Sequence, residues 1–378
     1  MRKIKKINSS HTEVLIIDEV GNESLLYCLP ENTEFRILVT RNELPVIPSI
    51  RFFITLVAMV AKFGFTPMAL ISSVIKCIKP KVIMTFTDNI SIMGRLAAFF
   101  PERKIISIQN GVRFKWGWDD NFTLPVFFGF GKYESELIKN RCVSVLEYKS
   151  VGSLKMGIFL SEHFKNNKKP HAKKRISFIS QYRHNMLDSK LKPWFGKFMN
   201  YSKEMFASIV NLSEINGYEV SIVMTNGKQD KDYAHELKYF KQAVDCSTVK
   251  FCPNVREEFS SYKKCIESDV LVTMDSTLGF EMFGYGKKIL FCGAMNNHFT
   301  NIRGSVELFE SLPKFAVLKE DESEINMLSD KLSFLLEMTN ENYLHSTEKS
   351  RLFYMDFGSS YPHDIVSNYI SNYMKNKD

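Results

Sequence analysis

The chain has 378 residues, 44% of them hydrophobic, which permits a large core and, at about 100–200 residues per domain, predicts two domains. Its formal net charge of +8 allows contact with an anionic nucleotide or a membrane surface, whereas a nucleic-acid-binding protein usually concentrates positive charge more strongly. The 7 cysteines form no CxxC pair, and no apolar signal core follows the basic start, so we expect a reduced, cytoplasmic protein.

The first half of the chain predicts strands that alternate with helices. A break is expected near Gly64 and Pro67, because proline lacks the backbone donor that a helix needs. Apolar strands that alternate with helices indicate a parallel sheet covered on both faces. Strands are predicted at 14–18, 35–40, 81–87, 104–109, 125–131 and 143–146, and helices at 49–79, 91–100 and 134–140.

The segment Ile50–Ala61 is the most hydrophobic part of the chain. It is flanked by Arg51 and Lys62 and is too short to span a bilayer, which takes about 20 residues. The pattern favours a helix buried in the core. Contact with a membrane surface is the alternative.

A polar, basic segment at 163–175 predicts a linker between two domains. A second α/β series follows, with strands at 176–180, 219–225, 249–252, 270–274 and 288–292 and helices at 202–216, 232–244, 260–267 and 364–375. We predict an N-terminal domain at 1–162, a second domain at 176–360 and a C-terminal helix at 361–378.

The predicted fold class is therefore α/β, with two Rossmann-like, doubly wound domains that face a cleft. Ligands of such sheets bind beyond the carboxyl ends of the strands. The candidate site residues are the polar side chains that follow predicted strands: Asp88, Asn89, Gln109, Asn110, Arg183, Asn226, Asp275, Ser276 and Thr277.

The stretch 268–293 carries the clearest local signal. An apolar strand at 270–274 is followed by Asp275, Ser276 and Thr277, which are residues that begin helices. A helix start presents unpaired N–H groups and the positive end of its dipole, so it suits a phosphate. Gly279 would let a ligand approach the backbone. A capped helix without any ligand explains the same residues.

Several familiar sites are absent from the sequence. It contains no GxxxxGK[ST] loop, no GxGxxG after the first strand, no HExxH and no GxSxG. These absences argue against a kinase, a dehydrogenase and a serine hydrolase. His184 and His298 lie near predicted strand ends. Trp116, within an aromatic run at 114–118, could stack on a sugar ring or anchor a loop.

Five segments together resemble bacterial surface carbohydrate biosynthesis proteins. The segments are 85–89, 105–111, 151–153, 179–183 and 275–281. These proteins look like GT-B glycosyltransferases, distantly similar to Kdo transferases and to the polyol-phosphate transferases of teichoic acid synthesis. The resemblance implies an N-terminal acceptor domain, a C-terminal nucleotide-sugar domain, and a terminal helix that crosses back to the first domain.

The resemblance also implies roles for single residues. On the donor side, Ser276 and Thr277 would hold the phosphate, Glu281 would face the ribose or base, and Arg183 would neutralise phosphate charge. Asp88 would be the catalytic carboxylate, as general base or nucleophile.

Plainer explanations stay open for these residues. Asp88 could cap the following helix, Glu281 could lie on the surface, and Arg183 could pair with an acidic side chain. Glu134 is a second carboxylate candidate, although helix starts favour acidic residues anyway.

We therefore expect a metal-independent glycosyltransferase of lipopolysaccharide or capsule synthesis. It would use a nucleotide sugar, with a CMP-Kdo-like donor favoured, and a glycan or lipid-linked glycan acceptor, without any other cofactor. The alternatives are a polyol-phosphate transferase, a nucleotide-sugar epimerase and a non-catalytic assembly subunit. The donor-side candidates also include His184, Asn226, Asp275 and Gly279, and the acceptor-side candidates are Asn89, Gln109, Asn110 and Trp116.

Overall fold

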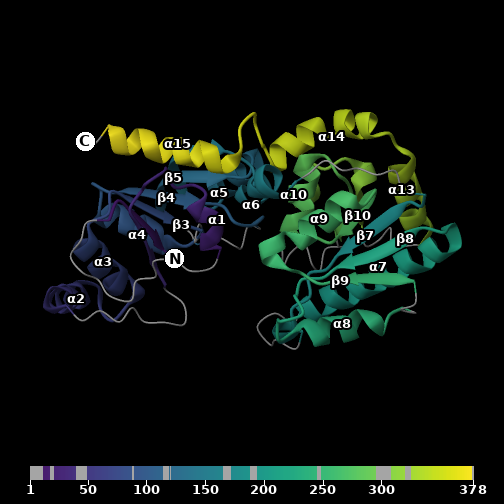
Figure 1. Cartoon of the computed structure of the whole chain (residues 1–378), viewed down its shortest axis with the longest axis horizontal. Coiled ribbons are helices and arrows are strands. Elements are labelled where there is room, and N and C mark those ends of the chain that lie inside the picture. Colours follow the sequence, from purple (N-terminus) through teal and green to yellow (C-terminus); the bar gives the residue numbers. More distant parts are fainter. Residues whose placement is uncertain are drawn as a thin grey trace. The chain divides into compact units, whose positions relative to one another are not determined.

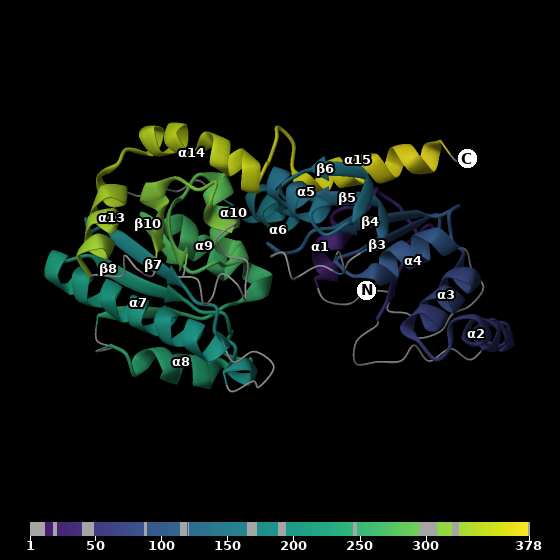
Figure 2. The same ribbon diagram turned by 180° about the vertical axis from the view of Figure 1, so that it is seen from behind.

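The structure is a computed structural model that describes residues 12–17, 21–39, 49–86, 89–113, 119, 121–164, 172–187, 194–244, 248–294, 308–319 and 325–376. The chain divides into two compact units. Unit 1 comprises residues 1–158 and 357–378, and unit 2 comprises residues 159–356. Each unit contains one six-stranded sheet (Figures 1 and 2), and every strand pair is parallel.

The sheet of unit 1 has the order β2-β1-β3-β4-β5-β6. Its elements are β1 Val14–Ile17, α1 Asn22–Leu26, β2 Phe35–Leu38, α2 Ile50–Phe63, α3 Pro67–Ile78, β3 Val82–Thr85, α4 Ser91–Phe99, β4 Lys104–Ile108, β5 Thr123–Gly129, α5 Lys132–Lys139, β6 Ser144–Ser150, α6 Leu154–Ile158 and α15 Pro362–Lys375.

The sheet of unit 2 has the order β12-β11-β10-β7-β8-β9. Its elements are the π-helix η2 Phe159–His163, β7 Arg175–Ile179, η3 His184–Met186, α7 Trp194–Asn216, β8 Glu219–Val223, α8 Tyr233–Lys241, β9 Val249–Cys252, η4 Arg256–Glu258, α9 Ser260–Glu267, β10 Val270–Thr273, α10 Thr277–Tyr285, β11 Lys288–Ala294, η5 Lys314–Ala316, β12 Val317–Lys319, α13 Ile325–Glu337 and α14 Asn340–Tyr354.

The predicted α/β fold of two Rossmann-like domains is confirmed. The strands form where short, β-branched apolar runs allow burial on both faces, and β1, β3 and β10 are buried along their whole length. In unit 2, right-handed crossovers place α7 and α8 on one face of the sheet and α9 and α10 on the other (Figure 2). The sequence did not predict α13 and α14, because α14 is rich in polar residues and has a weak apolar stripe.

The chain passes from unit 1 to unit 2 between Ile158 and Phe159. This point lies where α6 continues into η2, before the basic segment 163–175 that the sequence suggested as a linker. Residues 165–171 of that segment lie outside the described residues. The return to unit 1 comes between Asp356 and Phe357, slightly before the predicted start of the terminal helix.

The C-terminal helix α15 packs on unit 1, as the family resemblance implied (Figure 1). Val366 and Ile370 are fully buried. Tyr369 packs edge-on against Phe128 of β5, at 5.4 Å between ring centroids, and its hydroxyl donates to Glu147 of β6. The helix therefore covers the β5–β6 side of the first sheet.

The expectation that the segment 50–61 lies in the core is wrong. It forms α2, as a helix that ends before Gly64, but only Phe52 and Met59 of that helix are buried. Helix α3, by contrast, buries nine of its twelve residues. Periodic apolar residues predict a helix without saying which face meets the core, and here much of the apolar surface is exposed. Among the described residues no helix is long and apolar enough to cross a membrane.

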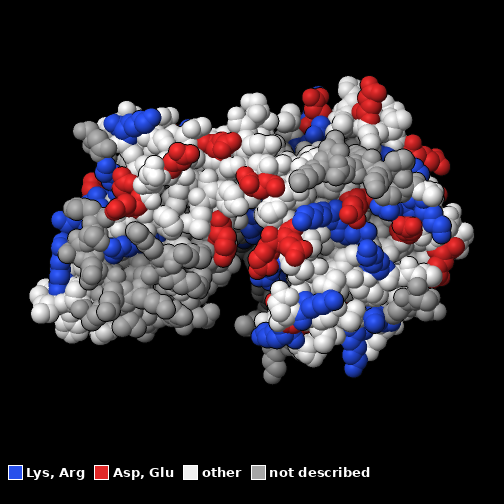
Figure 3. Space-filling model, viewed as in Figure 1, with Lys and Arg blue, Asp and Glu red and all other residues white. Residues whose placement is uncertain are grey.

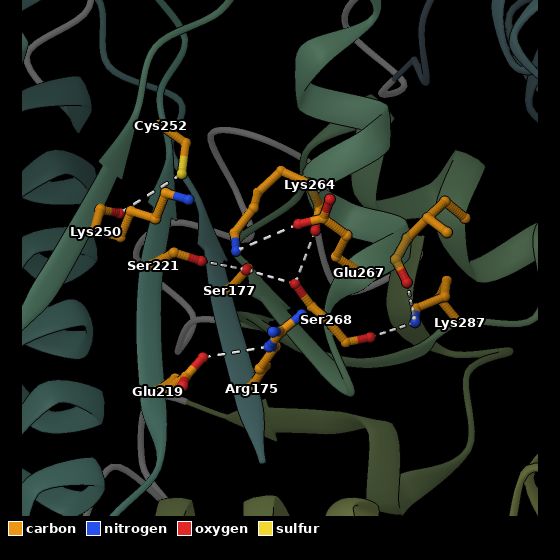
Figure 4. A network of polar contacts seen from close by, with 11 residues as sticks. Arg175, Ser177, Glu219, Ser221, Lys250, Cys252, Lys264, Glu267, Ser268 and Lys287 are labelled. Carbon is orange, nitrogen blue, oxygen red and sulfur yellow. Dashed lines mark hydrogen bonds and ion pairs between the residues drawn. The ribbon is translucent and has the colours of Figure 1, made fainter. Parts of the chain in front are cut away.

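A buried chain of serine hydroxyls ties the amino-terminal half of the second sheet together (Figure 4). The hydroxyl of Ser177 in β7 lies 2.6 Å from those of Ser221 in β8 and Ser268 before β10. At the same edge the Lys287 ammonium donates to the carbonyls of Ile266 and Ser268. These serine and lysine side chains thus have hydrogen-bond partners within the protein, so a structural role explains them without a ligand.

Candidate functional site

The candidate site of unit 2 lies where the strand order reverses. From β7 the chain proceeds to β8 and β9 on one side, and then returns to β10 on the other side of β7. The loops after β7 and β10 therefore leave the sheet in opposite directions, which creates the usual ligand position of a doubly wound sheet. Predicted residues follow both strands, namely Arg183 and His184 after β7 and Asp275 to Thr277 after β10.

A pair of hydrogen bonds joins these two loops. The Gln181 side-chain amide donates to Asp275 Oδ1 at 2.7 Å, and the Asp275 backbone N–H donates to Gln181 Oε1 at 3.1 Å. Asp275 is buried, at 5% exposure. It therefore holds the two strand ends together. Gln181 is a site residue that was not among the predicted candidates, although it directly follows a predicted strand.

Helix α10 begins directly after Asp275. Ser276 is its N-cap residue, with extended backbone (φ −66°, ψ 137°), and the Ser276 side chain makes no cap hydrogen bond. The Ser276 backbone N–H points instead to Thr273 Oγ1, at 3.4 Å. Thr277 is the first helical residue and is half-buried. The positive end of the α10 dipole thus lies at the strand-order reversal, where it can stabilise an anion.

Gly279 has a packing role in this structure. A Cβ atom built on Gly279 would lie 2.6 Å from Thr273 Cγ2, closer than real Cβ contacts come. The glycine therefore allows the first turn of α10 to pack tightly on the end of β10. This explains the residue without the close ligand approach that we expected.

Glu281 is neither exposed nor in an open position. The side chain is 2% exposed and accepts a hydrogen bond of 2.6 Å from the Tyr262 hydroxyl of α9. Burial, together with the Glu281 charge, raises the pKa of Tyr262 well above its usual value. The surface alternative for Glu281 is thus wrong, and its carboxylate joins α9 to α10.

Glu236 of α8 organises the loops beside the candidate site, and the sequence did not reveal it. Its carboxylate, fully buried, accepts from the Ser180 hydroxyl at 2.6 Å and from the backbone N–H groups of Thr225 and Asn226 at 2.9 Å. The Asn226 side-chain amide also donates to it, at 2.8 Å. Burial raises the pKa of Glu236, and these hydrogen bonds oppose that rise. Glu236 therefore holds the predicted donor-side residue Asn226 in position.

His184 and Arg183 lie exposed beyond β7. The His184 ring stacks on His235 of α8, with 3.8 Å between centroids and 12° between planes. Its Nδ1 lies 3.1 Å from the Tyr182 hydroxyl. Burial raises the pKa of Tyr182, with smaller contributions from the charges of Asp232 and Glu236. An exposed pair of stacked imidazoles thus borders the loop.

In unit 1 the predicted residues Gln109 and Glu134 bond to each other. Glu134 is 2% exposed, and its carboxylate accepts from the Gln109 side-chain amide at 2.6 Å. Gln109 Oε1 in turn accepts from the Phe130 backbone N–H at 2.6 Å. This buried pair connects the ends of β4 and β5 to α5, which accounts for both residues without a ligand. Asn110 donates to the Phe86 carbonyl at 3.4 Å.

Asp88 and Trp116 lie outside the described residues, as does His298. Asp88 follows β3, which with β1 forms the strand-order reversal of the first sheet. Asn89 is described, and its carbonyl accepts from the Asp119 backbone N–H at 3.0 Å. The Asp119 carboxylate accepts from the Ser91 N–H at 2.8 Å, so Asp119 supplies the N-terminal capping of α4 that was an alternative role for Asp88.

The packing role of Gly279 can be tested by a double-mutant cycle. Gly279→Ala forces a methyl group against Thr273, so we expect it to lower the free energy of unfolding by about 1–3 kcal/mol. Thr273→Ser removes the opposing methyl group and keeps the hydroxyl, so the double variant should recover part of that loss. Urea melts of the four proteins measure the coupling. Additive effects would contradict the packing role.

The comparisons with known proteins agree with this architecture. A "putative UDP-N-acetylglucosamine 2-epimerase" from Listeria monocytogenes superposes with a TM-score of 0.56 at 12% identity, covering 97% of this chain and 98% of that chain. The wall teichoic acid polymerase TagF gives 0.53 at 11% identity, covering 99% and 92%. The UDP-GlcNAc 2-epimerase of Methanocaldococcus jannaschii, solved with UDP-GlcNAc and UDP, gives 0.53 at 12% identity, covering 98% and 100%.

At such low identity these structures establish the fold alone, a two-domain Rossmann-like fold of the GT-B type. No curated protein sequence matches significantly. Residues 106–370 match the model of the family described as "putative O-antigen biosynthesis protein". Because the match spans well over half of the sequence, the chain belongs to this family of O-antigen biosynthesis proteins.

Proposed function

We propose that the protein is a glycosyltransferase that uses a nucleotide sugar to build a bacterial surface polysaccharide. The observation that carries the proposal is the start of α10, placed at the strand-order reversal of unit 2 and joined to the β7 loop by Gln181 and Asp275. Membership of the O-antigen family supports the pathway class. The solved structures of the same fold include proteins that were solved with UDP or with UDP-GlcNAc and UDP.

In this proposal the donor phosphate binds at the start of α10. The Ser276 and Thr277 hydroxyls and the first N–H groups of the helix donate to its oxygens, and the exposed Arg183 guanidinium balances its charge. These donors stabilise the negative charge that grows on the departing nucleotide. The Glu236 carboxylate acts indirectly, because it positions Asn226 and the loop after β7.

Asp88 is the proposed catalytic carboxylate. It follows β3 in the sequence and would take a proton from the acceptor hydroxyl or attack the sugar as nucleophile, since the transition state of glycosyl transfer has oxocarbenium character. The proposed acceptor is a glycan or a lipid-linked glycan. A CMP-linked sugar of the Kdo type is the donor that we favour, ahead of UDP- and GDP-sugars.

Two other activities are alternatives within the same fold, which the chain shares with UDP-GlcNAc 2-epimerases and a wall teichoic acid polymerase. An epimerase needs no acceptor, so it would convert a nucleotide sugar incubated with the protein alone into a new sugar. A polyol-phosphate transferase would put phosphorus into its product. Product analysis by mass spectrometry distinguishes these activities from glycosyl transfer.

Nucleotide binding gives the first test. One of CMP, CDP, UDP and GDP should raise the melting temperature of the full chain, because a ligand that binds only the folded state stabilises it. Thr277→Pro removes one N–H and one hydroxyl at a position where helices accept proline, and Ser276 already has the extended backbone that precedes proline (ψ 137°). We expect this variant to weaken nucleotide binding by roughly 10- to 100-fold.

The matched control is Asn340→Pro, at the first residue of α14, which also follows an extended N-cap residue. It should leave nucleotide affinity unchanged. The binding site would be wrongly assigned if Thr277→Pro bound the nucleotide as tightly as the unaltered protein. A chain that none of the four nucleotides stabilised would contradict the proposed function.

Asp88→Asn separates an enzyme from a non-catalytic assembly subunit. The substitution removes the charge and the basicity of the side chain while its size stays nearly the same, so we expect polysaccharide output in a complemented deletion strain to fall by at least roughly 100-fold. Nucleotide-induced stabilisation and the melting temperature should remain close to those of the unaltered protein. Undiminished polysaccharide would support the subunit alternative.

A further inference from the structure

Helix α2 presents a continuous apolar stripe to solvent. Ile50 is 83% exposed, Phe53 67%, Ile54 64% and Val57 55%. Their spacing of three and four residues places them on one face of the helix, and the exposed Ala58 and Ala61 continue that face by another turn. Beyond the end of α2, Phe65 is 96% exposed. The helix thus exposes the kind of face that helices normally bury.

The exposed stripe belongs to an ordered part of the fold. Helix α2 is capped by Ser49, whose hydroxyl accepts from the Phe52 N–H at 3.1 Å. It packs against α3, and its buried residues Phe52 and Met59 lie on the side opposite the stripe. Figure 1 shows α2 on the outer side of α3, away from the first sheet. Because α3 already provides the buried layer, the core does not need the apolar face of α2.

The charged residues in the sequence around the stripe are all basic. Residues 44–87 contain no Asp or Glu but five basic residues: Arg51, Lys62, Lys76, Lys79 and Lys81. Arg51 and Lys62 are about three turns apart and therefore border the same edge of the stripe. In Figure 3 the lower left region, where Figure 1 has α2, shows uncharged atoms with basic residues beside them.

Two of these cations contact the same aromatic ring. The Lys62 and Lys76 ammonium groups lie 4.3 Å and 5.3 Å from the centroid of the same ring, that of Phe99. The ring holds both side chains by cation–π attraction. Neither α2 nor α3 carries a carboxylate that could pair with these ammonium groups.

We infer that this face of unit 1 binds the surface of a lipid bilayer that contains anionic lipids, with α2 lying in the plane of the interface. The stripe from Ile50 to Ala61 and the Phe65 ring enter the boundary of the acyl chains, and Arg51, Lys62 and Lys76 meet lipid phosphates. The stripe has no hydrogen-bonding side chains, so it suits the acyl chains of a lipid bilayer. The basic residues beside it suit anionic lipid headgroups. The inference does not depend on the proposed transferase activity.

Vesicle co-sedimentation tests this surface with the full-length chain. We expect the protein to sediment with vesicles of phosphatidylcholine and phosphatidylglycerol, more weakly with phosphatidylcholine alone, and less as salt screens the charges. The triple variant Phe53→Ser, Ile54→Ser and Phe65→Ser should bind at least roughly tenfold more weakly. Because the three side chains are exposed, its melting temperature should stay unchanged.

The control variants are Leu146→Ser and Ile215→Ser, which remove apolar side chains that are 76% and 81% exposed on β6 and α7. They should bind vesicles like the unaltered protein. The inference is overturned if the unaltered chain does not sediment with anionic vesicles, or if the triple variant sediments as well as the controls do. It is also overturned if the triple variant instead converts an oligomer to a monomer, since a second copy would then cover the face.

Discussion

The strand order of unit 2 is the constraint on which the candidate site depends. Because β10 lies beside β7 and the chain leaves these two strands in opposite directions, their carboxyl ends are the place in the sheet where two loops diverge. The reciprocal hydrogen bonds of Gln181 and Asp275 hold those loops at a defined separation. Tight packing of Gly279 on Thr273 then fixes where the first turn of α10 begins.

A second layer of buried carboxylates supports this edge of the sheet. Glu236 collects hydrogen bonds from the ends of β7 and β8, and Glu281 ties α10 to α9 through Tyr262. A buried carboxylate is costly unless donors satisfy it, and here donors from the loops do so. The loops are thereby held in one arrangement, which is what a preorganised anion site requires.

Much of the fold could be predicted from the sequence, for identifiable reasons. Runs such as Val270–Thr273 are short, mostly apolar and rich in β-branched residues, so they indicate buried parallel strands. Residues that follow such strands, including Ser276 and Thr277, could be ranked as candidates by position alone. The glycine that ends α10, Gly286, has a left-handed backbone (φ 97°), as glycine at a helix end predicts.

The rest depends on tertiary contacts that a linear pattern does not contain. Glu134, Glu236 and Glu281 look alike in sequence, as acidic residues of short helices. Only their hydrogen-bond partners show that they are buried and connect neighbouring elements. Asp119 caps α4 from 28 residues further along the chain. Helix α2 has the periodicity of a core helix, and only the position of α3 shows that its apolar face points outwards.

A crystal structure with the stabilising nucleotide bound would test the central claim most directly. The account predicts a phosphate group whose oxygens lie within about 3 Å of the Ser276 or Thr277 hydroxyls or of the Thr277 N–H group, with the nucleoside along the loop after β7. A nucleotide bound away from the start of α10, with that helix start occupied by the protein's own side chains, would contradict the account.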